Sequence, residues 1–150
     1  MDILMWLRQL KRVPSQSCLH DRINFQFPWK PDNITQIHKT QATCFHHQML
    51  QQIFSLFSTE DSHAAWGGLV LPQLLVCLHY QLHELESANV QNLTCPDLGV
   101  AVRKYFQGIT SYLQEKKHRP CAWEVVRREI EERLFLIDRE LREEAASEES

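Results

Sequence analysis

Apolar residues recur along most of this chain at intervals of three and four residues, the period that places them on one face of an α-helix. The first such stripe comprises Ile3, Leu7 and Leu10. Pro14 ends this stripe, and from there to about His38 the sequence changes to turn residues without a sustained period. We therefore predict a helix over residues 2–12 and then a long crossover loop, a feature that is usually functional in a compact domain.

Four further apolar stripes follow the crossover. Their members are Phe45, Met49, Ile53, Leu56 and Phe57; Leu71, Leu75, Leu78, Leu82 and Leu85; Val102, Tyr105, Phe106, Ile109, Tyr112 and Leu113; and Val126, Ile130, Leu134, Ile137 and Leu141. The polar run "STEDS" suits a turn and a new helix start, and Asp97 is placed to cap the helix that follows it. No window shows the strict alternation of a strand. The pattern predicts an all-α bundle of about five helices, with parallel neighbours across the long crossover and antiparallel neighbours across the second and third connections.

Length and composition indicate one domain over residues 1–150. A chain of 150 residues, 43% hydrophobic and 23% charged, is long enough to bury a single core. The acidic tail, about residues 142–150, has little apolar surface to bury, and we expect it to be frayed. We see no need for a cofactor or a metal ion to hold this bundle together.

Charge excludes one class of partner and hydropathy a second. The net charge of -3 and the pI near 6.2 lack the clustered positive excess of proteins that bind nucleic acid. No run of about 18 apolar residues is present, so we expect no insertion into a membrane. Nucleic acid and the bilayer are therefore set aside as partners.

Other features point outside the cell. Asn33 and Asn92 begin the N-glycosylation sequons "NIT" and "NLT". Five cysteines exceed what a cytosolic chain of this size needs, and because five is odd at least one is unpaired or bonds between molecules. The start "MDILMWLRQLKR" does not read as a signal peptide, because its basic residues follow the apolar ones. We interpret the chain as the mature, extracellular form of a secreted protein whose signal peptide has been removed.

Candidate chemistry is sparse. His79 and His83 are spaced to face one metal ion, but no general base or third ligand accompanies them, so exposure on the solvent face of the leucine helix is favoured. His46 and His47 are adjacent and point in different directions on a helix. Cys121 at a helix start would have a lowered pKa, which makes a thiol-dependent enzyme the strongest enzymatic alternative, ahead of a zinc-dependent one. No glycine-rich loop, oxyanion hole or triad motif supports it, and we expect no catalytic residue and no metal site.

Three stretches resemble the type I interferons: "CLHDRINFQFP", "MLQQIFSLFSTEDSHAAW" and "AVRKYFQGITSYLQEKKHRPCAWEVVRREI". They are similar to the family's first crossover, second helix and C-terminal signature, and the resemblance runs from about Ile3 to Leu136. It implies a five-helix long-chain helical cytokine bundle and a monomeric, secreted ligand. Such a ligand joins both chains of the interferon alpha/beta receptor, so that their Janus kinases trigger an antiviral and antiproliferative response. The alternative is another helical cytokine with different receptors, which the "CAWE" and "CLxDR" motifs disfavour.

The resemblance also implies a disulfide between Cys18 and Cys121. On the chain-entropy model a closed loop of about 100 residues stabilises by about 4–5 kcal/mol, and Trp123 would pack beneath the bond as part of the core. The second bridge of the common alpha type is not possible, because Ala88 occupies its position and the N-terminal segment with its cysteine is missing, a shortness that resembles the delta-type subgroup. One pair at most can form among Cys44, Cys77 and Cys95, and three pairings stay open.

Two receptor-binding surfaces are implied in the same way. Residues matching contacts of the high-affinity chain are Leu19, Arg22, Arg127, Arg128, Glu131 and Glu132. Residues matching contacts of the second chain are Phe54, Thr59, Leu75, His79, Arg103 and Lys104. Arg22 is the expected hot spot, because an arginine at a partly desolvated interface forms paired, charge-assisted hydrogen bonds. The alternative for Arg22 is an intramolecular bond to Asp21 or a loop carbonyl.

The chain departs from the family pattern on both surfaces. Glu131 and Glu132 stand where the family often has an apolar residue followed by arginine, which reverses local charge and predicts weaker or retuned binding. Leu75 and His79 replace family tyrosines on the second surface. Core packing is the alternative for Phe54, and Arg103, whose alternative is a solvated helix face, is favoured as a contact by the resemblance.

Overall fold

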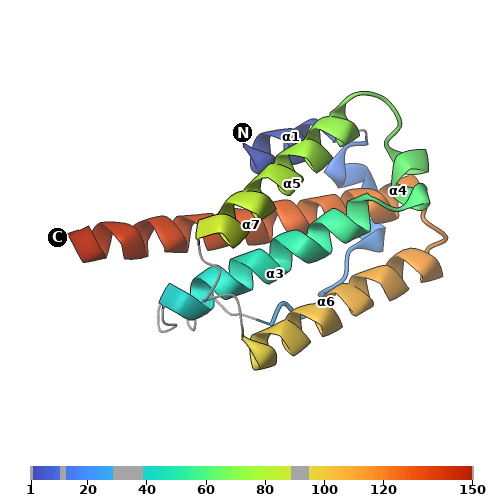
Figure 1. The fold of residues 1–150 in the computed structure, drawn as a ribbon. Helices are drawn as coiled ribbons and strands as arrows, with labels where there is room; N and C mark the ends of the chain where they lie inside the picture. The colour runs from blue at the N-terminus through green and yellow to red at the C-terminus, as the bar shows by residue number, and fades with distance from the viewer. Residues whose placement is uncertain (1, 11–12, 29–38, 89–94, 150) are drawn as a thin grey trace.

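The computed structural model describes residues 2–10, 13–28, 39–88 and 95–149. These residues form seven helices and no strand (Figure 1). The helices are α1 (Ile3–Gln9), the 3₁₀ helix η1 (Ser15–Asp21), α3 (Lys39–Phe57), α4 (Glu60–Ala65), α5 (Val70–Ala88), α6 (Pro96–Glu115) and α7 (Pro120–Glu149). The predicted all-α class is confirmed. The predicted count of five omitted η1 and α4, whose sequences "SQSCLHD" and "EDSHAA" carry no apolar stripe.

The long helices form a bundle with α3 at its centre. α3 contacts α5, α6 and α7, while α1 packs against α5 and α7. α1, α3 and α6 run in one direction and α5 and α7 in the opposite direction (Figure 1). The parallel arrangement of α1 and α3 agrees with the prediction for helices joined by a long crossover.

The predicted stripes form most of the core. Those of α3 and α6 are buried throughout, and so are four of the five members of the α7 stripe. The α5 stripe differs, because Leu74 and Cys77 are fully buried while Leu75 and Leu85 are half-buried. α5 packs against α1 as well as against α3, so it buries a wider part of its surface than the single predicted stripe.

Trp123 is part of the core, as the resemblance implies, and it lies at the centre of an aromatic cluster. Its side chain is buried, and its ring centroid is 4.8 Å from that of Trp66 and 6.2 Å from that of Phe57. Edge-to-face and tilted ring pairs at these distances add to the gain from burying aromatic area. The cluster joins the start of α7 to the end of α3 and to α4.

The helix starts differ from one prediction. Asp97 is not the N-cap of α6: Cys95 is, Pro96 begins the helix, and Asp97 lies in the first turn. A proline at the first position needs no backbone donor, and a carboxylate one residue later interacts favourably with the helix dipole. Thr59 caps α4 by accepting a 3.2 Å hydrogen bond from the backbone N–H of Ser62.

Some predictions fall at or beyond the edge of what the structure describes. α7 continues as a helix to Glu149, through most of the acidic segment for which the composition predicts fraying, and the fraying itself stays a prediction. Asn33 and Asn92 lie outside the described residues. Within the described ranges, no helix is both long enough and apolar enough to cross a bilayer.

His46 and His47 contact different helices, as their adjacent positions predict. His47 Nε2 is 3.0 Å from a carboxylate oxygen of Glu86 on α5, and His46 Nε2 is 3.6 Å from Asp138 on α7. Burial, and to a smaller extent the charge of the neighbouring His47, lower the pKa of His46 to about 4. The Asp138 carboxylate favours the charged ring, but the loss of hydration outweighs it.

We expect the free energy of unfolding to fall as the pH is lowered from about 6.5 to about 4. In this range the unfolded chain protonates position 46 and the folded chain does not, so about 3 kcal/mol of stability is lost by pH 4. Urea unfolding of the wild type and of His46→Leu at several pH values measures this, because the variant should show a flatter dependence. His83→Gln, which removes an exposed histidine, is the matched control; equal slopes for wild type and His46→Leu would contradict the prediction.

Candidate receptor-binding surfaces

A disulfide between Cys18 and Cys121 joins the crossover to the start of α7, as the resemblance implies. The two Cα atoms are 5.1 Å apart and the cysteines are separated by 103 residues in sequence. The bond holds η1 against α7. Because Cys121 is bonded it is not a free nucleophile, so the thiol-enzyme alternative at this position is wrong.

Asp21 forms a second anchor for the crossover. Its carboxylate is 3.5 Å from Lys116 Nζ and 3.4 Å from Arg119 Nη2, both in the connection between α6 and α7. Its backbone carbonyl accepts a 2.5 Å hydrogen bond from the hydroxyl of Tyr112 on α6. The end of η1 is therefore tied to α6 as well as to α7.

Two phenylalanines hold the chain after η1 against the bundle. The Phe25 ring meets Tyr112 edge-on with centroids 5.2 Å apart, and Phe27 meets Tyr105 in the same way at 5.2 Å. The guanidinium of Arg133 on α7 lies 4.8 Å from the centre of the Phe27 ring, a cation–π distance. The motif "INFQFP" thus supplies the apolar contacts that fix an otherwise irregular segment.

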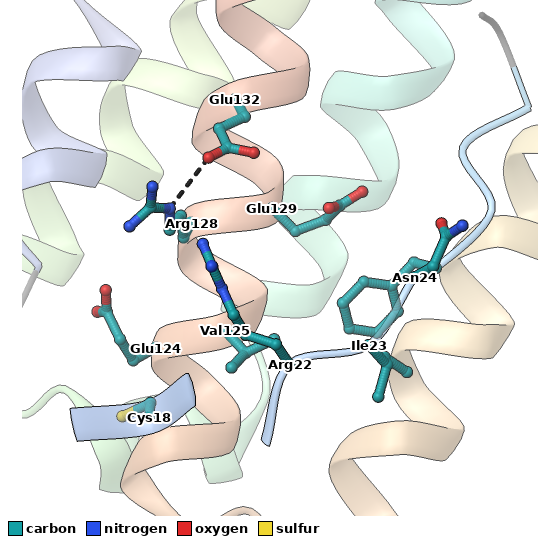
Figure 2. A pocket seen from close by; sticks show the side chains of 10 residues that line it. Cys18, Arg22, Ile23, Asn24, Glu124, Val125, Arg128, Glu129 and Glu132 are labelled. Atoms are coloured by element: carbon teal, nitrogen blue, oxygen red, sulfur yellow. Dashed lines mark hydrogen bonds and ion pairs between the residues drawn. The ribbon is translucent and has the colours of Figure 1, made fainter. Parts of the chain in front are cut away.

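Residues 22–25 and α7 enclose a groove of about 420 Å³, which we call the crossover groove (Figure 2). Its walls are Cys18, Arg22, Ile23, Asn24 and Phe25 on one side and Glu124, Val125, Arg128, Glu129 and Glu132 on the other. Ile23 is 50% exposed beside Arg22, and Leu19 is 54% exposed on η1. Arg22 is itself exposed, and its guanidinium makes no hydrogen bond or ion pair with the described residues. Asp21 is engaged elsewhere, so the predicted intramolecular alternative for Arg22 is not formed there.

Glu131 and Glu132, the two acidic residues that depart from the family pattern, differ in how accessible they are to a binding partner. Glu131 is 20% exposed and bonds to Arg8 on α1 at 3.1 Å. Glu132 is well exposed and bonds to Arg128 at 3.0 Å on the rim of the crossover groove (Figure 2). The prediction that both residues present negative charge to a partner therefore applies mainly to Glu132.

Arg127 is buried and bonded within the protein, which disfavours the prediction that it contacts the receptor directly. Arg127 is only 3% exposed, and two nitrogens of its guanidinium donate hydrogen bonds of 2.7 Å each to the Glu124 carboxylate. A third nitrogen donates to the backbone carbonyl of Leu7 on α1 at 3.2 Å. Burial alone lowers the pKa of Arg127, but the hydrogen bonds and charge of Glu124 outweigh it and the net pKa is raised. The sequence spacing could have indicated this burial, because residue 127 comes four positions after Trp123 and so lies on the same buried face of the helix.

The residues predicted for the second surface divide along the two sides of α3. Toward α5, the half-buried Phe54 ring lies 6.1 Å from the ring of the exposed His79, and Leu75 is half-buried one turn before His79. Phe54 and Leu75 both pack against the core, so core packing, the alternative for Phe54, accounts for part of the role of each.

Toward α6, the second surface is polar. Arg103 lines one groove of about 460 Å³ between α3 and α6, and Thr59 lines an adjoining one of about 300 Å³. Both grooves include Gln52 and Thr110. Arg103 and Lys104 are exposed, and neither forms an ion pair within the described part of the chain.

The remaining cysteines resolve a choice that the sequence left open. Cys44 bonds to Cys95, with Cα atoms 6.2 Å apart, and Cys77 is free and buried. His79 and His83 are exposed on α5, and no cluster of three or more His, Cys, Asp or Glu side chains suited to a metal ion occurs within the described ranges. The resemblance also missed Ile23 and Val125, apolar residues of the crossover groove whose exposure depends on how the crossover folds.

Comparison with known proteins identifies relatives over nearly the whole chain. A family model described as the interferon alpha/beta domain matches residues 1–144. Interferon alpha-7 of Homo sapiens is 48% identical over 134 residues, which covers 85% of this chain and 71% of that protein. Interferon omega-1 of Homo sapiens is 45% identical over 144 residues (90% and 73%), and interferon alpha-H of Bos taurus is 45% identical over 135 residues (85% and 71%). Placement in the delta-type subgroup stays a prediction.

We expect Arg127→Ala to lower the free energy of unfolding by about 3–5 kcal/mol, because it removes two hydrogen bonds and a positive charge from the buried Glu124 carboxylate. Arg128→Ala, one residue further on, breaks an exposed pair and should cost less than about 1 kcal/mol. Urea unfolding at pH 7 compares the two. Replacing both members of the buried pair, Glu124→Leu with Arg127→Met, should recover most of the loss; a small effect of Arg127→Ala alone would show that the pair contributes little.

Proposed function

Since the chain belongs to the interferon alpha/beta family and is a type I interferon-like cytokine rather than an enzyme, we propose that it is a secreted, monomeric ligand joining the two chains of the interferon alpha/beta receptor. Bringing the chains together lets their associated Janus kinases phosphorylate each other, which starts an antiviral and antiproliferative response. The observation that carries this proposal is Arg22 at the crossover groove, which is exposed and has no side-chain partner among the described residues. An acidic group on a binding partner could supply the hydrogen-bond acceptors that the Arg22 guanidinium lacks among the described residues.

The first receptor chain would bind at the crossover groove. Arg22 stands beside the exposed apolar side chains of Leu19 and Ile23, so a partner carboxylate would meet the guanidinium in a partly desolvated setting. Charge-assisted hydrogen bonds are strongest under these conditions. Because the disulfide and the anchors of Asp21 already fix this segment, little conformational freedom remains to be lost on binding.

The rim of the groove would set selectivity among receptor chains. Glu132 faces outward and partly neutralises Arg128, so this rim presents a balanced ion pair instead of two cations. A receptor surface with a basic group opposite Glu132 would gain an ion pair, whereas an acidic one would be repelled. This supports the expectation that the chain is tuned to a particular receptor sequence.

The second receptor chain would bind across α3, α5 and α6. The exposed Arg103 and Lys104 offer two cations without partners among the described residues, and Thr59 and His79 lie at the borders of this face. The mixture of exposed cations with half-buried apolar groups is typical of a moderate-affinity interface with a polar rim. Phe54 and Leu75 would contribute through their exposed edges.

We expect Arg22→Ala to lower the affinity for the high-affinity receptor ectodomain by at least about 2 kcal/mol, roughly thirtyfold. The variant should fold normally, because the Arg22 side chain makes no bond within the described structure. Surface plasmon resonance measures the affinity, and Lys104→Ala, which removes an exposed cation from the other surface, is the matched control. Unchanged affinity in a folded variant would remove Arg22 from the binding site.

The function itself is tested by a reporter assay for interferon-stimulated transcription. The wild-type protein should activate the reporter, and an antibody that blocks the receptor should abolish the response. Arg22→Ala should shift the response to higher concentrations. No response from folded wild-type protein would contradict the proposed function.

We expect Glu132→Arg to strengthen binding to the same ectodomain by about fivefold, equivalent to about 1 kcal/mol. The change removes a negative charge from the rim and releases Arg128 from its ion pair. The gain should appear mainly in the association rate and shrink at high salt. Glu84→Arg alters net charge equally at an exposed position on α5 and should leave this affinity unchanged; weaker binding by Glu132→Arg would show that the receptor prefers the acidic residue.

A further inference from the structure

The bond between Cys44 and Cys95 lies at one end of the contact between α3 and α6. Cys44 is a buried residue near the start of α3, and Cys95 immediately precedes α6, 51 residues later. The two helices begin at the same end of the molecule and run in the same direction (Figure 1). The disulfide therefore fixes both the separation and the register of two parallel helices at their starts.

The start of α6 is anchored by Cys95 and by Leu98, which packs against the core one turn into the helix. Cys95 is the N-cap, and its side chain makes no capping hydrogen bond. Most helices use Ser, Thr, Asp or Asn at this position to satisfy a free backbone N–H. Here the side chain forms the covalent link to α3 instead, so the position of the first turn of α6 depends on that link.

Contacts repeat along the two helices from this point in steps of four residues. One turn on, a Cβ on Gly99 would lie 4.0 Å from the side chain of Gln48 and 3.5 Å from Nη1 of Arg103, so α6 approaches α3 closely there. A further turn on, Gln52 and Arg103 line the same groove. A shift at the start of α6 would therefore move Arg103 relative to Gln48 and Gln52 on α3.

Arg103 and Thr59 are the polar residues of the second candidate surface on this seam. Arg103 is eight residues after Cys95, about 12 Å along the helix axis. It forms no ion pair with any described residue, so no charged neighbour holds its guanidinium in place. The backbone of α6 therefore sets where this cation begins relative to α3, and its guanidinium lies over Gly99 of the same helix.

We propose that the Cys44–Cys95 bond is the positioning element of the second receptor surface, as Cys18–Cys121 is of the first. It holds the start of α6 in register with α3 and so places Arg103 and Lys104 relative to Thr59. This inference rests on the proposed function, because it assigns each disulfide to one of the two receptor chains. Without the bond, the first turn of α6 opens, while the anchors of the crossover groove at Tyr112, Lys116 and Cys121 lie at or beyond the far end of α6 and stay in place.

The test compares binding of Cys44→Ser/Cys95→Ser to the two receptor ectodomains, each immobilised separately. We expect a loss of about twofold to thirtyfold for the second chain, with less than a twofold change for the high-affinity chain. Circular dichroism and binding to the high-affinity chain report whether the variant is folded. Cys77→Ala, which removes the free buried cysteine, is the matched control and should change neither affinity.

Equal losses for both chains, or less than a twofold loss for the second, would overturn the proposal. Cys44→Ser/Cys95→Asp separates the covalent link from helix capping, because aspartate restores an N-cap without the bond. We expect this variant to remain impaired toward the second chain, and full recovery would also overturn the proposal. Failure of the wild type to bind either ectodomain would instead overturn the proposed function, and this assignment with it.

Discussion

The covalent link between Cys18 and Cys121 is the constraint on which the rest of the first surface depends. The crossover contains only one short 3₁₀ helix among its described residues, so it has no long apolar face to pack against the bundle. The disulfide supplies one fixed point, and Asp21 and the rings of Phe25 and Phe27 supply others. These contacts hold the neighbours of Arg22 inward, and Arg22 itself is exposed, with no side-chain partner in the part of the chain that the structure describes.

α7 shows how burial decides the role of chemically similar residues. Arg127 and Arg128 are adjacent, yet one is locked between Glu124 and the backbone of α1, and the other forms an exposed pair on the groove rim. Removing water from an ion pair makes each partner depend on the other, whereas an exposed pair exchanges with solvent at little cost. α7 thus stabilises the bundle through its buried face, and its exposed face presents an ion pair that a binding partner can rearrange.

Much of the candidate site could be read from the sequence, and its errors have identifiable causes. The resemblance supplied the Cys18–Cys121 pairing and the exposed positions Leu19, Arg22 and Glu132. It also placed Arg127 among the receptor contacts, although this side chain is buried, because a match to a family gives the position of a residue and not its burial. The pairing of Cys44 with Cys95 was open, since it depends on which of three cysteines meet after α3, α5 and α6 have packed.

The sequence by itself determined the all-α class, the long helices and most of the core, because each depends on a local period that a single segment carries. The core position of Trp123 was also expected, from the resemblance. Only the tertiary structure decided which charges meet, which cysteines bond and how the crossover lies, because these depend on the relative rotation and register of helices far apart along the chain. Short elements such as η1 and α4 belong with this second group, since caps and neighbours define them instead of a repeating pattern.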